Sequence, residues 1–88
     1  MHEMSLFKPL LRRLEQIAEE ESSPSIAGAT VRLGAFAPIS PEHFREHWDE
    51  FTRGTIADGA ALTVVRDDDE GSPHAQSIVL ECVEIEVG

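Results

Sequence analysis

The first three residues of the chain, Met1, His2 and Glu3, form the clearest chelating pattern in the sequence. Methionine aminopeptidases require a small second residue, so Met1 is expected to stay in place and His2 to remain second. The α-amine of Met1 and the amide and imidazole nitrogens of His2 can then bind one ion in fused rings, with Glu3 adding an oxygen. Such nitrogen ligands in a tetragonal arrangement suit Ni(II) or Cu(II) better than Mg²⁺ or Ca²⁺. The triplet is therefore a candidate transition-metal site, and these residues alone leave open the alternative of a solvated terminal histidine.

A second pair of histidines lies in the segment from His43 to His47, which reads H-x-x-E-H. On a helix these two side chains share one face, and Glu46 could polarise a water as in the inverted zincin peptidases. That chemistry also needs a distant third ligand and a substrate cleft, for which this chain is short. An incidental transition-metal site is therefore favoured over a peptidase centre, with His47 at the edge of an apolar stripe and His43 more exposed.

The remaining polar and thiol residues indicate structure rather than catalysis. The run from Asp67 to Glu70 lacks EF-hand spacing, because Gly71 is not at the sixth position of a twelve-residue loop and no glutamate closes it. A solvated hairpin turn is favoured, with His74 making it at most a weak cation trap. Cys82 is predicted to be a small core residue. The sequence shows no Ser-His-Asp arrangement and no glycine-rich phosphate loop, so no enzymatic activity is expected.

Composition narrows the class of partner. The chain has 88 residues, of which 7 are basic and 17 acidic, for a formal net charge of −10. This negative field repels nucleic acid and anionic membranes and favours cations or basic protein surfaces. A lone cysteine excludes an internal disulfide, and no apolar run suits a signal peptide or a membrane span. We expect one cytoplasmic domain, residues 1–88, with a thin core.

Two helices are predicted from apolar stripes of helical period. The first covers residues 6–18, with Ser5 as its N-cap and Pro9 as an awkward residue near its start. The second begins with Ser40 as N-cap and Pro41 at its first helical position. Its buried face consists of Phe44, Trp48 and Phe51.

Three strands are predicted from alternating patterns over residues 29–36, 61–66 and 78–87. The apolar face of the last strand is expected to consist of Val79, Val83, Ile85 and Val87. The element order is thus α-β-α-β-β. We expect an α/β (α+β) fold with two helices packed on one face of a mixed three-stranded sheet, because this arrangement buries both stripes.

The opening hexapeptide, residues 1–6, also belongs to a longer pattern that continues along most of the chain. Its further segments are residues 31–35, Pro41, Glu42 and Phe44, residues 52–55, Gly59, Ala60 and Leu62, and residues 84–87. In this set and order the chain resembles the HypA/HybF family, the nickel metallochaperones of hydrogenase maturation. The resemblance implies a HypA-like nickel-binding domain in which the N-terminal amine of Met1, His2 and Glu3 form or support the nickel site.

The same resemblance implies a role and partners. Ni(II) would be a transiently bound cargo, passed towards the large subunit of a NiFe hydrogenase, or towards urease in some organisms. A HypB-like GTPase would be the partner in that transfer.

One departure from the family pattern leaves two interpretations open. Members carry a zinc domain with paired C-x-x-C motifs between the last two strands, whereas here that space holds only residues 67–77 and Cys82 is the sole cysteine. No structural zinc is therefore expected. The chain is either a metallochaperone reduced to its nickel domain, or a HypA-like protein-interaction module that has lost metal delivery along with the zinc domain. In the second case its acidic surface or an open sheet edge would dock a basic partner.

Overall fold

The computed structural model describes the backbone of residues 2–86 and the side chains of residues 5–86. In this part of the chain no helix is long and apolar enough to cross a membrane. The elements, in chain order, are α1 (His2–Glu20), β1 (Ile26–Leu33), α2 (Pro41–Thr52), β2 (Ala61–Arg66) and β3 (Ile78–Ile85). The predicted order α-β-α-β-β is confirmed.

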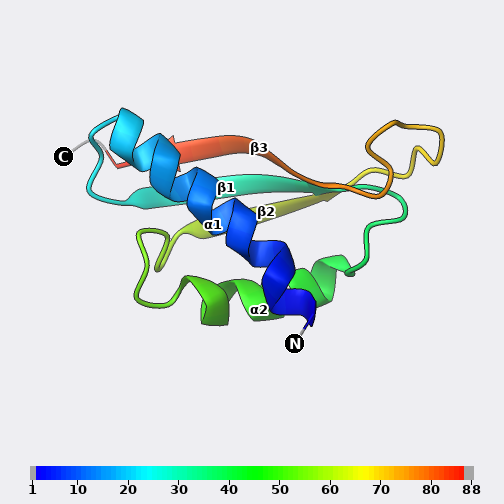
Figure 1. The fold of residues 1–88 in the computed structure, drawn as a ribbon, viewed down its shortest axis with the longest axis horizontal. Helices are drawn as coiled ribbons and strands as arrows, with labels where there is room; N and C mark the ends of the chain where they lie inside the picture. Colours follow the sequence, from blue (N-terminus) through cyan, green and yellow to red (C-terminus); the bar gives the residue numbers. More distant parts are fainter. Residues whose placement is uncertain (1, 87–88) are drawn as a thin grey trace.

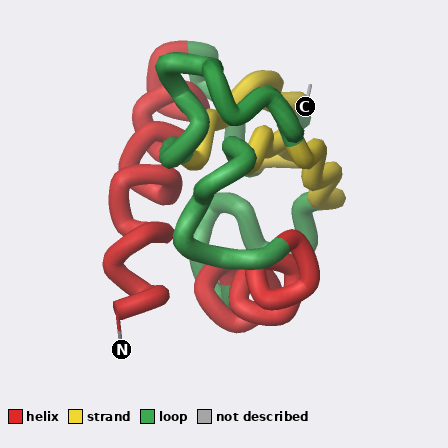
Figure 2. Tube along the Cα trace, turned by 90° about the vertical axis from the view of Figure 1, so that its right-hand side faces the viewer, coloured by secondary structure: helices red, strands yellow, loops and turns green. Residues whose placement is uncertain are grey.

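The three strands form one mixed sheet in the order β2-β1-β3. The central strand β1 is parallel to β2 and antiparallel to β3. Parallel neighbours need a crossover connection, and α2 provides it between β1 and β2. Both helices cover the same face of the sheet: α1 crosses in front of the strands, and α2 lies below β2 (Figure 1). The side view shows the helices together on one side of the strands (Figure 2). The predicted fold class is therefore confirmed.

Helix α1 buries the predicted stripe but begins earlier than predicted. It starts at His2, so Ser5 lies inside the helix and is not its N-cap. Pro9 also lies inside, where its missing amide hydrogen removes one helical hydrogen bond but its exposed ring meets no core side chain. The buried residues of the stripe are Phe7, Leu10, Leu14 and Ala18.

Helix α2 begins as predicted. The amide of His43 donates to the Ser40 side-chain oxygen at 3.2 Å, and Pro41 occupies the first turn. This bond satisfies one of the amides that a helix start leaves without a backbone acceptor. Phe44 and Trp48 are buried and Phe51 is partly buried against the same core.

Strand β1 is displaced from its predicted range by three residues, since it runs from Ile26 to Leu33 instead of from 29 to 36. The chain leaves the ladder at Gly34, whose amide donates to the carbonyl of Ser77, and Phe36 donates to Ala75. The loop before β3 thus takes the place of a neighbouring strand at this point. Strand β2 has the predicted bounds.

Strand β3 contains an irregularity that the alternating pattern did not predict. Thr30 pairs with Cys82 but Val31 pairs with Leu80, so Glu81 is an extra residue on β3. Such a bulge shifts the phase of alternation. The β3 side chains packed against the core are Ile78, Leu80, Val83 and Ile85.

Three expectations about the last strand change as a result. Val79 pairs with Arg32 and lies on the opposite face of the sheet from Val83 and Ile85, so its predicted place was wrong. Cys82 is exposed and is not a core residue, because the bulge precedes it. Val87 lies outside the described residues.

Candidate metal centre

The predicted N-terminal ligands stand at the start of α1. Met1 lies outside the described residues, as do the side chains of His2 and Glu3. The backbone of His2 and Glu3 forms the first turn of α1. Amides of a first helical turn have no acceptor within the helix, so helix formation does not occupy the amide nitrogen of His2. The backbone is thus compatible with the chelate, and the ligand set remains a prediction.

Phe7 fixes the first turns of α1 against α2. Its side chain is fully buried, and its ring centroid lies 4.8 Å from that of Phe44 and 5.0 Å from that of Phe51. His2 stands five residues before Phe7, about 7.5 Å along the helix axis at 1.5 Å per residue. The start of α1, in blue, accordingly lies beside α2 (Figure 1). Aromatic packing in the core therefore places the first turns of α1 next to the second helix.

The two histidines of α2 lie at this same end of the molecule. The ring centroids of His43 and His47 are 6.4 Å apart, and their planes make an angle of 52°. His47 is half-buried and meets the Phe7 ring edge-on, with 6.3 Å between centroids and 61° between planes. His43 is exposed. The prediction that His47 packs at the edge of the apolar stripe and His43 points more to solvent is confirmed.

A peptidase centre is not assembled around this pair by the side chains of residues 5–86. Among them no group of three His, Cys, Asp or Glu residues is placed to hold one metal ion. The pair therefore offers two ligands from this part of the chain, and Glu46 stands exposed on the same helix.

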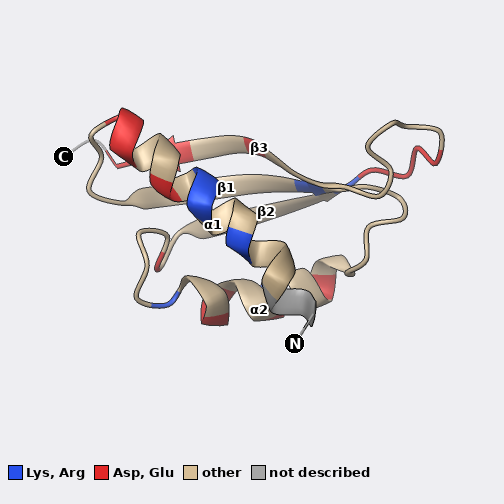
Figure 3. Ribbon diagram, viewed as in Figure 1, with Lys and Arg blue, Asp and Glu red and all other residues tan. Residues whose placement is uncertain are grey.

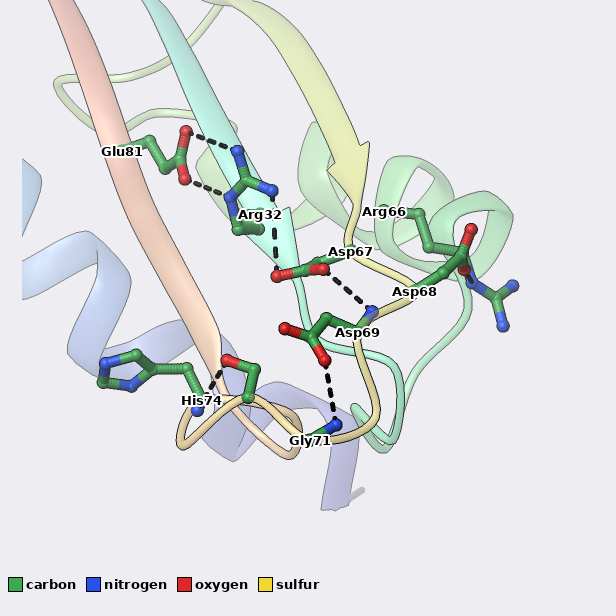
Figure 4. Close-up of polar contacts among 9 residues, drawn as sticks. Arg32, Arg66, Asp67, Asp68, Asp69, Gly71, His74 and Glu81 are labelled. Atoms are coloured by element: carbon green, nitrogen blue, oxygen red, sulfur yellow. Dashed lines mark hydrogen bonds and ion pairs between the residues drawn. The ribbon is translucent and has the colours of Figure 1, made fainter.

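The acidic loop is used for turn formation. The carboxylate of Asp67 accepts from the amide of Asp69 at 3.0 Å, and that of Asp69 accepts from Gly71 at 3.0 Å (Figure 4). The backbone of His74 donates to the Ser72 hydroxyl. Side chains that cap their own backbone in this way are typical of turns. The loop is an exposed turn-forming segment as predicted, but the prediction of a hairpin was wrong, because β2 and β3 lie on opposite sides of β1 and do not pair with each other.

Sequence reasoning missed an ion-pair cluster on the open face of the sheet. The guanidinium of Arg32 on β1 makes two hydrogen bonds to the carboxylate of Glu81 on β3, and it lies 3.9 Å from Asp67 (Figure 4). Hydrogen bonding to Arg32 lowers the pKa of Glu81, and the same bond with Glu81 raises the pKa of Arg32. The bulged register of β3 brings these side chains together. The sequence itself showed only opposite charges on two predicted strands, which is too little to predict an ion pair.

Acidic residues are otherwise dispersed. They are found on α1, α2, β3 and the loop after β2, and no single element carries them all (Figure 3). The cation-attracting field of the net charge is thus spread over the molecule.

The architecture belongs to the class of small α+β domains with two helices on one face of a mixed sheet. A protein of this class with a similar fold is the Ni metallochaperone HypA from Helicobacter pylori, whose solution structure superposes with a TM-score of 0.78. The match covers 93% of this chain and 95% of that chain at 14% sequence identity, a level at which the likeness concerns the fold alone.

Sequence similarity defines the family. The family model described as hydrogenase/urease nickel incorporation, metallochaperone, HypA matches residues 1–85, and the chain belongs to this family. It is similar to the hydrogenase maturation factor HypA of Acidithiobacillus ferrooxidans, with 35% identity over 65 residues, and to that of Archaeoglobus fulgidus, with 34% over 64 residues. These matches cover 74% and 73% of this chain and 58% of each relative, so the chain spans little more than half the length of the curated relatives.

Proposed function

We propose that this chain is a nickel carrier: it binds Ni(II) as cargo at its N-terminus and delivers the ion for incorporation into a nickel enzyme. The observation that carries the proposal is the match of the HypA family model over residues 1–85, a range that includes the chelating triplet Met1, His2 and Glu3. The family is one of nickel incorporation factors rather than one defined by a catalytic reaction. We propose residues 1–88 as a single nickel-binding domain.

The chemistry of the proposed ligands suits a carrier. The terminal amine, the amide and the imidazole nitrogen of His2 are consecutive donors and can occupy adjacent positions of a tetragonal nickel ion. Glu3 follows as an oxygen donor that is weaker and easier to replace. A ligand set at a chain terminus is also open to an incoming acceptor site on one side.

The proposal is tested first by calorimetric titration with nickel of protein that has an authentic N-terminus. We expect sub-micromolar binding, better than about −8 kcal/mol. His2→Ala removes the imidazole, and one residue added before Met1 converts the amine into an amide, so each should abolish tight binding. His74→Ala, in the exposed loop, is the matched control and should bind as the parent does.

Tight binding by the extended protein would contradict the proposed ligand set, because that protein lacks the terminal amine. Weak binding by the authentic protein would contradict nickel carriage itself.

We further propose the partners that this role requires: a HypB-like GTPase and the large subunit of a NiFe hydrogenase or a related nickel enzyme. The family description supports the hydrogenase and urease connection. We also propose that the domain needs no structural zinc, since the loop of residues 67–77 is closed by its own hydrogen bonds and by those to Gly34 and Phe36.

The second candidate function is a HypA-like interaction module without metal delivery. It is favoured by the short loop between β2 and β3, which occupies the place where the family's zinc domain is expected, and by the single cysteine of the sequence. Capture of the same partner by the parent protein and by His2→Ala would support this candidate. Capture of a hydrogenase large subunit only with intact His2 would exclude it.

A further inference from the structure

We propose that His43 and His47 form a second binding site for a transition-metal dication, of the class Ni²⁺, Cu²⁺ or Zn²⁺, on the surface of α2. The two imidazoles would supply two ligands and water the others. The inference does not depend on the N-terminal chelate, because it is tested in a protein that lacks that chelate.

The helical spacing places both rings on one face of α2, within reach of a shared ion after a side-chain rotation. Residues four apart on a helix have their Cβ atoms about 5–6 Å apart on the same face. A metal–nitrogen bond of about 2.0–2.1 Å places each ring centroid about 3 Å from a shared ion, so two centroids can be no more than about 6 Å apart. The observed separation is 6.4 Å. The rings are therefore too far apart for one ion as they stand, and His43, which is exposed, has to rotate towards His47 to close the pair.

The surrounding contacts hold one ligand in place and leave the other adjustable. The His47 ring packs edge-on against Phe7, whose own ring is held by Phe44 and Phe51. The backbone of His43 is fixed because its amide donates to the Ser40 side chain at the start of α2. A partly preorganised pair loses less side-chain entropy on binding than two free surface histidines would.

The charge of α2 also favours a cation. The helix sequence PEHFREHWDEFT contains four carboxylates and a single arginine, Arg45. All four acidic residues are exposed, and they raise the local concentration of cations near the pair. Imidazole nitrogens select nickel, copper and zinc over magnesium and calcium within that field.

The position of His43 and His47 close to α1 gives the proposed metal site a role in the movement of an ion. Through Phe7, His47 is in contact with the helix that carries the N-terminal residues, so an ion on α2 is held at the same end of the molecule as the start of α1. The two histidines can therefore form a second, transient binding site for an ion that enters or leaves the domain.

The experiment removes the N-terminal chelate first. A protein with one residue added before Met1 and with His2→Ala is titrated calorimetrically with nickel chloride and, separately, with zinc chloride. We expect one site per chain for each ion. His43→Ala or His47→Ala in this background should weaken it by about tenfold or more, since either change leaves a single imidazole. His74→Ala should leave it unchanged.

A matched variant distinguishes the effect of histidine spacing on binding from the effect of histidine number. Arg45→His combined with His43→Ala keeps two histidines on α2 but places them two residues apart, on different faces of the helix. It should bind as weakly as His43→Ala alone. Because alanine is a good helix former and His43 is exposed, these variants should keep the fold, which thermal unfolding by circular dichroism checks.

Two results would overturn the inference: no binding of either ion by the starting protein, or binding that His43→Ala does not weaken. A direct readout is the NMR spectrum, in which substoichiometric Cu²⁺ should broaden the ring signals of His43 and His47 before those of His74. Equal broadening of all three would also overturn it. None of these results bears on the N-terminal chelate, which is measured in the protein with an authentic terminus.

Discussion

Arg32 lies between two carboxylates on the sheet face that the helices leave open. Its bonds to Glu81 connect the central strand to β3 at the bulge, and Asp67 approaches from the end of β2. The cluster therefore ties the three strands together at the start of the acidic loop. Because these groups remain partly exposed to water, the pairing fixes geometry more than it adds stability.

The lowered pKa of Glu81 predicts a specific pH dependence. Its folded-state pKa lies below the ordinary value of 4.5, so the stabilisation from the ionised carboxylate is fully present above pH 4.5. It is lost as pH falls through the lowered pKa. Glu81→Gln should therefore reduce the thermal midpoint modestly at pH 7, with a difference that shrinks as pH falls below 4.5 through the lowered pKa.

The measurement is thermal unfolding of both proteins across that range, with Glu50→Gln on the exposed surface of α2 as the control. An unchanged difference at pH 7 and pH 3 would mean that the ionised pair contributes nothing and that Gln acts through packing.

At the scale of the elements, the connection between β2 and β3 packs directly against the end of β1. A side chain at Gly34 would place its Cβ 2.3 Å from the carbonyl oxygen of Ala75 and 2.4 Å from that of His74. These are backbone atoms, so the loop itself would have to move. Gly34 is thus required here because the loop folds back directly onto the end of β1.

We expect Gly34→Ala to destabilise the fold by about 1–3 kcal/mol, the usual cost of an inserted group in a packed region. Gly71→Ala is the control, since the nearest atom to its added Cβ would be a carboxylate oxygen of Asp69 at 3.5 Å. Urea unfolding gives both values. Hydrogen exchange at the Phe36 amide, which bonds to Ala75, should accelerate only in the first variant. Equal stability of the two variants would show that the loop adapts without cost.

On the scale of the whole molecule, a single thin core holds the two helices to the sheet. Phe44 is fully buried and stacks on Phe7, so it joins α2 to α1 as well as to the strands. We expect Phe44→Ala to lower the free energy of unfolding by about 3–5 kcal/mol, a large share of the stability of a small domain.

Phe36→Ala is the matched control, because that ring is 54% exposed. It should change stability by less than about 0.5 kcal/mol. Chemical denaturation with an unchanged slope measures both. A small effect of Phe44→Ala would mean that the two helices dock independently.

Local signals predicted the fold well because each acts within a few residues. The Ser40–Pro41 start of α2 and the apolar stripes of both helices were read correctly for this reason. The bulge in β3 and the end of β1 depend on which residues pair with each strand across the sheet. Local sequence patterns do not predict that pairing. The same holds for the sites: the spacing of His43 and His47 predicted a shared face, but the contact of His47 with Phe7 and the Arg32 cluster follow from packing and register.

The central place of β1 has a consequence for biosynthesis. Both of its partners come later in the chain: β2 pairs with it from Ala61 onward, and its first residue, Ile26, is opposite Ile85. While the ribosome is still translating the middle of the chain, α1 and β1 therefore have no sheet to pack against. Their apolar side chains remain accessible to chaperones until β3 emerges, so the domain is expected to fold only after β3 has been synthesised and not progressively from its N-terminus.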